Sequence, residues 1–201
     1  MSLRYLWQVP VCLFFALLIS TPSTAGEPTE KIKETTNKIL AIVTNPELKG
    51  PDKAAERRRL IRKVVDERFD WEEMSRRTLA RHWKKRTAAE KKEFVELYST
   101  LLERTYLDQV EGYSGEKVLF VDEKVDGDYG VVEIRIITTR QTEIPVKYKI
   151  RKKGNDWFGY DIDIQGVSLI NNYRTQFNSI IVRSSYEELI KRLKAKVGEQ
   201  D

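Results

Sequence analysis

Residues 146–164 have the sequence VKYKIRKKGNDWFGYDIDI, in which apolar side chains alternate with charged ones on both sides of a Lys-Gly-Asn-Asp stretch at 153–156. A period of two places apolar side chains on one face of a strand and charged ones on the other. Gly-Asn between two such runs is typical of a hairpin turn. The segment therefore predicts two antiparallel strands with one apolar face and one charged face.

Two more strands are predicted before this hairpin. One begins at residues 118–120, and residues 132–136 alternate in the same way after an Asp-Gly-Asp turn at 126–128. Four strands joined by short links form an antiparallel meander, which can pack one face on a core and leave the other in water.

Helical periodicity flanks the strands on both sides. It predicts helices at 28–44, at 52–68, from Asp70, from Thr87 to Gly112, from Ser168, and from Ser185 to about Val197. Thr87 and Glu90 have the spacing of a capping box, and Asp52 and Asp70 are candidate N-caps. The predicted fold class is α+β: N-terminal helices, a four-stranded curved antiparallel sheet and C-terminal helices that close over it. We expect a cone-shaped layout similar to that of nuclear transport factors.

Residues 1–25 differ in composition from the rest of the chain. Arg4 precedes an unbroken apolar run at 11–19, and Ser23 and Ala25 are small residues at the spacing of a signal peptidase site. The run is shorter than the ~20 residues of a membrane-spanning helix. We therefore expect a cleavable signal peptide, and an uncleaved N-terminal anchor is the alternative.

The chain's single cysteine, Cys12, lies inside that segment. The mature chain, residues 26–201, is expected to form one domain without disulfides, zinc–thiolate sites or cysteine nucleophiles. A cysteine-free exported domain indicates the periplasm of a bacterium.

The 201-residue chain is rich in charge, with 33% charged residues and a formal net charge of +5. Basic runs occur at 57–59, 76–77, 84–86 and 151–153, but acidic residues are interspersed with them. Nucleic-acid binding favours basic runs with exposed aromatic side chains and little acid nearby. We therefore expect solvated helix faces and no nucleic-acid partner. A weaker interpretation is contact with anionic lipid headgroups or acidic partner surfaces.

Side chains that commonly carry catalysis are scarce. The only histidine, His82, is surrounded by cations, and we expect it at a partly exposed helix end. The chain has no glycine-rich phosphate loop, nucleophile elbow or metal-ligand spacing, so we expect no metal, no cofactor and no enzyme activity. The best catalytic candidates are Asp161 and Asp163 on one strand face. The simpler interpretation is that both face solvent near Lys147 and Lys149.

Two segments resemble the MlaC, or toluene-tolerance, family. The first is Trp83 to Thr87, followed by Phe94, Leu97, Leu101 and Tyr106. The second is WFGYDIDIQGVSLINNYRTQF at 157–177, which is similar to the family's W…YD…GVS…YR.QF block. The similarity extends from about Glu30 to Leu193. One departure is Gln165, where family members often have Glu.

The resemblance implies a periplasmic phospholipid carrier of an Mla-type ABC transport system, which maintains outer-membrane lipid asymmetry. Family members hold acyl chains in a cavity between helices and sheet. They exchange lipid with the MCE-domain subunit of an inner-membrane ABC transporter and with an outer-membrane lipoprotein complex. Phospholipid is then cargo rather than cofactor, and we expect a monomer. A hopanoid-associated carrier of the same family, an acid/base enzyme of similar layout and an adaptor without ligand are the alternatives.

The expected lipid-binding residues are large apolar side chains of the helices and of the inner sheet face, although the same side chains could form an ordinary filled core. They are Tyr98, Leu101, Leu102, Tyr106, Val132, Ile134, Ile136, Tyr148, Ile150, Ile162, Ile164, Val167, Leu169, Tyr173 and Phe177.

Overall fold

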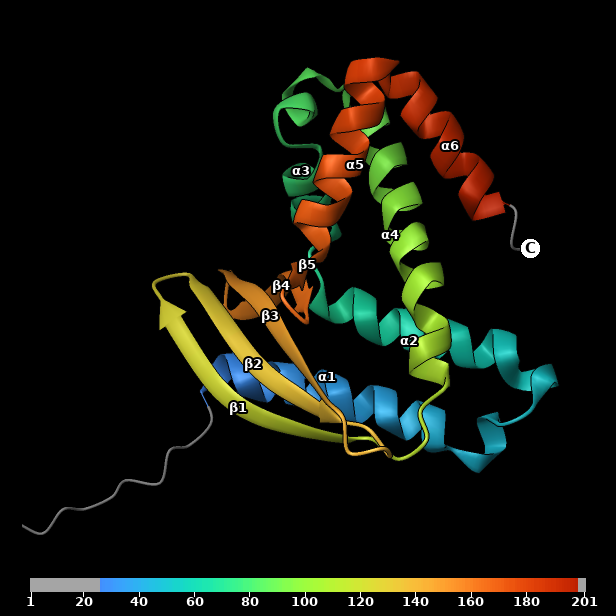
Figure 1. Ribbon diagram of the computed structural model, residues 1–201, viewed down its shortest axis with the longest axis vertical. Coiled ribbons are helices and arrows are strands. Elements are labelled where there is room, and N and C mark those ends of the chain that lie inside the picture. Colours follow the sequence, from blue (N-terminus) through green and yellow to red (C-terminus); the bar gives the residue numbers. More distant parts are fainter. Residues whose placement is uncertain (1–25, 199–201) are drawn as a thin grey trace, which may run out of the picture.

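A five-stranded antiparallel sheet lies at the centre of the computed structural model, which describes residues 26–198 (Figure 1). Its strands pair in chain order: β1 (Lys117–Asp126), β2 (Tyr129–Ile137), β3 (Glu143–Lys153), β4 (Asp156–Ile164) and β5 (Val167–Ser168). The four long strands confirm the predicted meander. The fifth, β5, is too short to show an alternation in the sequence. Residues 1–25, where we predict the signal peptide, lie outside the described residues.

Residues 26–198 also form six α-helices. They are α1 (Glu27–Thr44), α2 (Ala54–Arg68), α3 (Trp71–Leu79), α4 (Ala88–Glu111), α5 (Leu169–Arg183) and α6 (Tyr186–Gly198).

Polar side chains cap four of these helices, including α6, where Ser185 Oγ accepts the Glu188 backbone N–H at 3.2 Å. Thr87 and Glu90 form the predicted capping box of α4, and the Asp70 carboxylate accepts the Glu73 backbone N–H at the start of α3. Ser168 caps α5. The expectation for Asp52 was wrong: it lies in a short 3₁₀ turn, Pro51–Lys53, and α2 begins after it without a side-chain cap. An aspartate that precedes a helix in the sequence can be its N-cap or can belong to a short turn before it.

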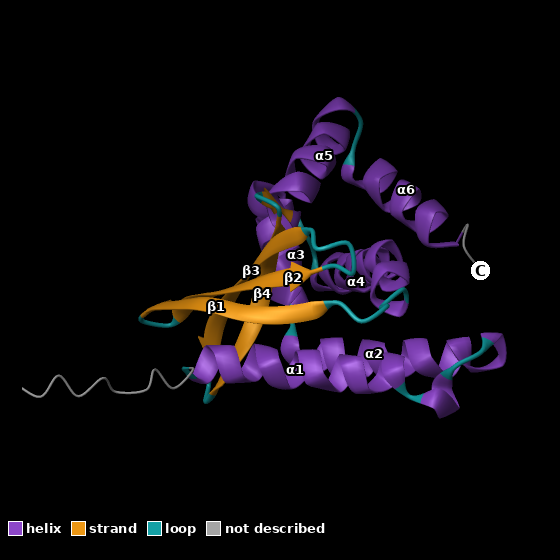
Figure 2. Ribbon diagram, turned by 60° about the horizontal axis from the view of Figure 1, so that its bottom comes forward, coloured by secondary structure: helices purple, strands orange, loops and turns teal. Residues whose placement is uncertain are grey.

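The helices form two groups (Figures 1 and 2). The antiparallel pair α1 and α2 lies along one face of the sheet, while α3, α4, α5 and α6 gather beyond the β4–β5 end. Each group has its own core. The helical core contains Met74, Leu79, Trp83, Phe94, Tyr98, Leu101, Leu102, Ile170, Tyr173, Phe177, Tyr186, Leu189, Ile190 and Leu193. The sheet core contains Ile32, Val132, Ile134, Val146, Ile150 and Trp157.

A β-bulge at Tyr160 changes the faces of β4. Asp161 pairs with Lys149 and Gly159 pairs with Ile150, so Tyr160 is an extra residue without a partner across the ladder. A bulge reverses the alternation along a strand. Tyr160 therefore packs against the helical core, whereas Ile162 packs against the sheet core. The uninterrupted alternation predicted from the sequence is wrong at this point.

Candidate functional site

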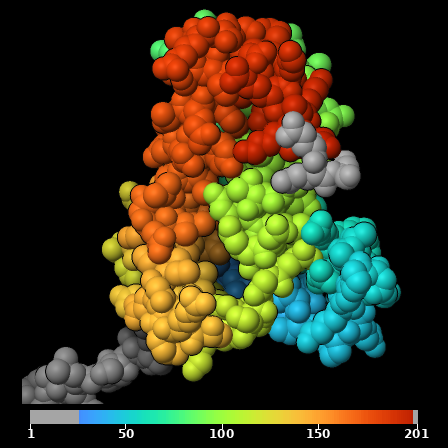
Figure 3. Space-filling model, turned by 45° about the vertical axis from the view of Figure 1, so that its right-hand side comes forward, coloured from blue at the N-terminus to red at the C-terminus, as the bar shows by residue number. Residues whose placement is uncertain are grey.

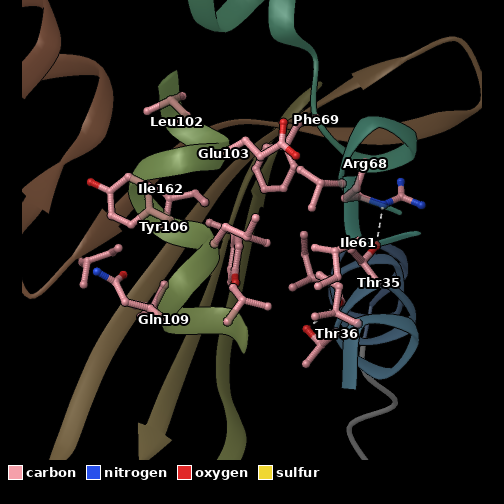
Figure 4. A pocket seen from close by; sticks show the side chains of 18 of the residues that line it. Thr35, Thr36, Ile61, Arg68, Phe69, Leu102, Glu103, Tyr106, Gln109 and Ile162 are labelled. Carbon is pink, nitrogen blue, oxygen red and sulfur yellow. Dashed lines mark hydrogen bonds between the residues drawn. The ribbon is translucent and has the colours of Figure 1, made fainter. Parts of the chain in front are cut away.

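A pocket of about 390 Å³ lies between the sheet and the helices α1, α2 and α4. Figure 3 shows a hollow between α4 and the sheet, with α1 at its base. Figure 4 shows α4 side chains, including Leu102 and Tyr106, facing those of α1 and α2 across the pocket. Four elements therefore contribute walls to a space that their side chains leave unfilled.

The walls of the pocket are almost entirely apolar. The helix α1 contributes Ile32, Ile39, Leu40 and Val43, and α2 contributes Ile61 and Val65. Three- and four-residue spacings place these side chains on one stripe of each helix. The sheet contributes Val118, Ile134, Ile136, Val146, Tyr148, Ile162 and Ile164, and α4 contributes Leu102, Tyr106, Leu107 and Val110.

Two threonines and an arginine beside the pocket are bonded to other protein groups. The Thr36 hydroxyl donates to the Ile32 carbonyl at 2.8 Å. The Thr35 hydroxyl donates to the Lys31 backbone carbonyl at 2.9 Å and accepts from Arg68 Nε at 3.1 Å. The threonines therefore bond their hydroxyls to neighbouring groups, which suits an apolar wall. Arg68 is buried, and its guanidinium also contacts Asp156.

The buried Arg68 guanidinium is paired with the Asp156 carboxylate, which also pairs with Lys31. Burial would raise the pKa of Asp156, but the Trp157 backbone N–H, the Lys31 ammonium and the Arg68 guanidinium together hold it below its usual value. Burial raises the pKa of the Tyr106 and Tyr148 phenols, so both stay neutral over the physiological range. At these two positions the pocket therefore presents neutral phenols. The charged residues that line it, Arg62, Arg68, Glu103 and Glu116, are bonded to other protein groups.

Eight of the predicted lipid-binding residues line the pocket. They are Leu102, Tyr106, Ile134, Ile136, Tyr148, Ile162, Ile164 and Leu169. Their position is consistent with the predicted role, and the role itself stays a prediction.

The other seven predicted residues lie away from the pocket, which corrects their expected position. Tyr98, Leu101, Tyr173 and Phe177 fill the helical core, and Val132 and Ile150 are buried in the sheet core. Val167, on β5, is 55% exposed. The periodicity of a segment identifies its apolar face but does not say which element covers that face.

The walls contributed by α1 and α2 were missed. Their amphipathic stripe, which includes Ile39 and Val43, was visible as a helix pattern. No feature of the sequence indicates that this stripe lies against the sheet across an open space, because that depends on how distant segments pack.

Asp161 has a structural role that the sequence did not suggest. Its side chain is buried and accepts hydrogen bonds from Ser168 Oγ at 2.7 Å, from the Ile170 backbone N–H at 3.1 Å and from Lys149 Nζ at 2.9 Å. The neighbourhood of Lys149 is confirmed, but the expected solvent-facing position is wrong for Asp161. Neither Asp161 nor Asp163 lines the pocket. Asp161 instead fixes the start of α5 to the sheet.

The only histidine of the chain, His82, does not line the pocket. His82 is partly exposed within the 3₁₀ segment Ala80–Lys85 that follows α3, where it shares the Asn178 side-chain oxygen with Arg81. Within residues 26–198, no cluster of histidine and acidic side chains could hold a metal ion. Across the same residues, no helix is both long and apolar enough to span a membrane.

The family described as "MlaC protein" matches residues 33–195. A curated relative, the "Intermembrane phospholipid transport system binding protein MlaC" of Haemophilus influenzae, is 23% identical over 122 residues. That match covers 58% of this chain and 57% of the relative, so the chain spans little more than half of the relative's length.

One solved structure shares the fold. It is described as a phospholipid-binding protein from Ralstonia solanacearum in complex with a phospholipid, and it matches with a TM-score of 0.78. The identity is 22%, and the match covers 87% of this chain and 98% of that one.

Proposed function

Because the chain belongs to the MlaC family, we propose that it is a phospholipid carrier that holds acyl chains in the pocket between the sheet and α1, α2 and α4. The observation that carries this proposal is the pocket itself, an apolar space that residues from four elements surround without filling. The phospholipid-bound structure of the same fold supports it.

The energetics suit a carrier. A buried methylene contributes about 0.8 kcal/mol, so one acyl chain of ~15 methylenes would gain roughly 12 kcal/mol on leaving water. Two chains would exceed the ~18–21 kcal/mol at which non-covalent affinity saturates, before the costs of binding are subtracted. Loss of lipid to water would then be negligible. A bilayer offers the chains almost the same environment, so exchange between carrier and membrane would be close to thermoneutral.

Polar residues occur at separate points of the pocket boundary (Figure 4). Arg62 of α2 and Glu103 and Gln109 of α4 are among the residues that line it. A headgroup would lie near them and in water, because the remaining walls offer few hydrogen-bonding groups. This arrangement favours recognition of hydrocarbon over recognition of one headgroup.

The cellular setting is part of the proposal. We infer that residues 1–25 are a cleaved signal peptide, that residues 26–201 form a single domain, and that the carrier works as a monomer in the periplasm. It would exchange lipid with the MCE-domain subunit of an inner-membrane ABC transporter and with an outer-membrane lipoprotein complex. Since transfer to a bilayer is nearly thermoneutral, the direction of transport must come from these partners or from ATP hydrolysis.

Extraction of the protein tests the proposal. The protein is purified from the periplasmic fraction without detergent, extracted with chloroform–methanol, and the extract is analysed by mass spectrometry. We expect phospholipid in near-stoichiometric amount. A lipid-free extract would count against a carrier. An extract containing only hopanoids would show that the cargo is a hopanoid and not a phospholipid.

A further inference from the structure

Side-chain ion pairs join α2 to α4 over the pocket. Arg57 Nε donates to Glu111 Oε1 at 2.7 Å, and Arg58 Nε donates to Glu111 Oε2 at 3.2 Å. Arg62 Nη1 donates to Glu103 Oε2 at 2.6 Å. We call these contacts the α2–α4 seam.

Beneath the seam, the two helices present apolar side chains to the pocket. These are Ile61 and Val65 of α2 and Leu107 and Val110 of α4. Within residues 26–198, none of the four belongs to the helical core or to the sheet core. Charged contacts of the seam thus lie beside apolar side chains that line the pocket, of which Ile61 and Leu107 are buried.

Other helix pairs are joined differently. The backbones of α1 and α2, of α3 and α5, and of α4 and α6 approach closely, whereas α2 and α4 stay further apart. Separating packed apolar surfaces exposes hydrocarbon to water at a cost that grows with area. Separating an ion pair that water can reach costs less, because water and other ions replace the partner. The arginine side chains of the seam are 17%, 50% and 26% exposed at Arg57, Arg58 and Arg62. The seam is therefore a side of the pocket that can open at a lower cost than the closely packed helix pairs.

We propose that lipid enters and leaves the pocket through the α2–α4 seam, and that its ion pairs hold this side of the pocket closed between transfers. This inference rests on the proposed carrier function. The exposed part of the seam also suits contact with a membrane: the Arg58 side chain is 50% exposed. Lipid phosphates can replace a carboxylate as the partner of a guanidinium.

Neutralising the carboxylates of the seam is the first test. Glu111→Gln and the double variant Glu103→Gln/Glu111→Gln remove charge from α4 with little change of shape. The matched control is Glu93→Gln on the same helix, because Glu93 pairs with Lys194 of α6 at 2.6 Å, away from the pocket. Each protein is loaded with a fluorescent phospholipid, and transfer to phosphatidylcholine vesicles is followed by stopped flow. Unfolding in urea confirms that each variant is folded.

We expect the double variant to release lipid about tenfold faster than wild type, which corresponds to a barrier to release that is lower by ~1.4 kcal/mol. The Glu93→Gln control should release lipid at the wild-type rate. A double variant that releases lipid no faster than this control would overturn the role of the ion pairs.

Locking the seam is the second test. Arg58 Nη2 and Asp108 Oδ1 lie 3.8 Å apart, and both side chains are at least half exposed. The variant Arg58→Cys/Asp108→Cys, purified as the mature chain without Cys12, can be joined at these two positions by a short bis-maleimide after lipid loading. The cross-linked protein should release lipid at least about tenfold more slowly than the same variant before cross-linking, which is again ~1.4 kcal/mol.

The outcomes separate the two proposals. Wild-type protein that takes up no lipid overturns the carrier function and the seam together. Wild-type protein that takes up lipid, with cross-linked protein releasing it as fast as uncross-linked protein, overturns the seam alone.

Discussion

The helical core and the pocket are built from the same kinds of side chains, yet only the helical core is filled. The helix α4 passes through both. In its first half, the Phe94 ring lies edge-on to Phe177 at 5.9 Å and Tyr98 lies 5.5 Å from Tyr173. In its second half, Tyr106 faces the pocket. Apolar character therefore specifies burial, and the surrounding elements decide whether a buried face meets protein or a space for ligand.

Truncation of one aromatic side chain in each half of α4 should show the largest contrast. Phe94 is fully buried, so Phe94→Ala should reduce the free energy of unfolding by about 3–5 kcal/mol through lost burial and a new cavity. Tyr106→Ala only enlarges an existing space and should cost less than ~1.5 kcal/mol. Urea unfolding of the two variants measures both values. Equal losses would mean that the pocket is as tightly packed as the core.

A charge in the pocket should remove lipid without unfolding the protein. Tyr106→Asp places a carboxylate against hydrocarbon, where burial of an unpaired charge costs several kcal/mol unless the group becomes neutral. We expect lipid retained after purification to fall about tenfold, and Tyr106→Phe should retain the wild-type amount. Quantitative lipid mass spectrometry measures both. A folded Tyr106→Asp protein with undiminished lipid would show that Tyr106 is not a wall of the binding site.

Asp161 joins the two regions, so its loss should weaken the fold but not the pocket. Asp161→Asn removes the charge that faces Lys149 and weakens the hydrogen bonds at the start of α5. We expect a loss of about 1–3 kcal/mol in the free energy of unfolding. Bound lipid per folded protein should stay unchanged. A large loss of lipid from this variant would restore a direct role for Asp161 in the site.

Acid should weaken the attachment of α3 to the sheet. Burial would raise the pKa of Asp70, but the hydrogen bonds from Arg151, from the Glu73 backbone N–H and from Lys153 lower it below its usual value. A lowered pKa in the folded state stabilises the protein above the unfolded-state pKa, and this contribution disappears as the pH falls through the folded-state value.

The urea concentration at which half of the protein is unfolded should therefore decrease as the pH is lowered from 5 to 3. The decrease should be smaller in Asp70→Asn. Equal slopes for wild type and Asp70→Asn would remove Asp70 from the acid response.

The smallest effect is expected at Val167, which we first predicted to bind lipid and which is exposed on β5. Val167→Thr should change the free energy of unfolding by no more than about 0.5 kcal/mol. Retained lipid should be the same as in wild type. A clear loss of lipid would mean that β5 contacts the cargo after all.

Local chemistry explains what could be predicted from the sequence. The alternation at 146–164 predicted β3 and β4, and Thr87 and Glu90 predicted the start of α4, because strand faces and helix caps depend on neighbouring residues. The bulge at Tyr160 could not be predicted in this way. The bulge lets Tyr160 pack against the helical core and Ile162 against the sheet core. The alternation of apolar and charged residue types along β4 continues through it without a break.

The candidate site was predicted only in part for the same reason. The walls from the sheet and from α4 follow from their apolar faces, and Tyr106 and Ile136 are examples. The walls from α1 and α2 depend on how that helix pair lies along the sheet, which residues far apart in the chain determine. The pocket between these walls therefore depends on the packing of distant segments and not on any one segment of the sequence.

Native mass spectrometry tests the central claim most directly, because it reports the mass of the protein together with what it holds. Protein purified from the periplasm without detergent is expected at the mass of residues 26–201 plus one or two phospholipids, with the added mass lost in Tyr106→Asp. A peak at the mass of the protein alone, unchanged after incubation with phospholipid vesicles, would contradict the account.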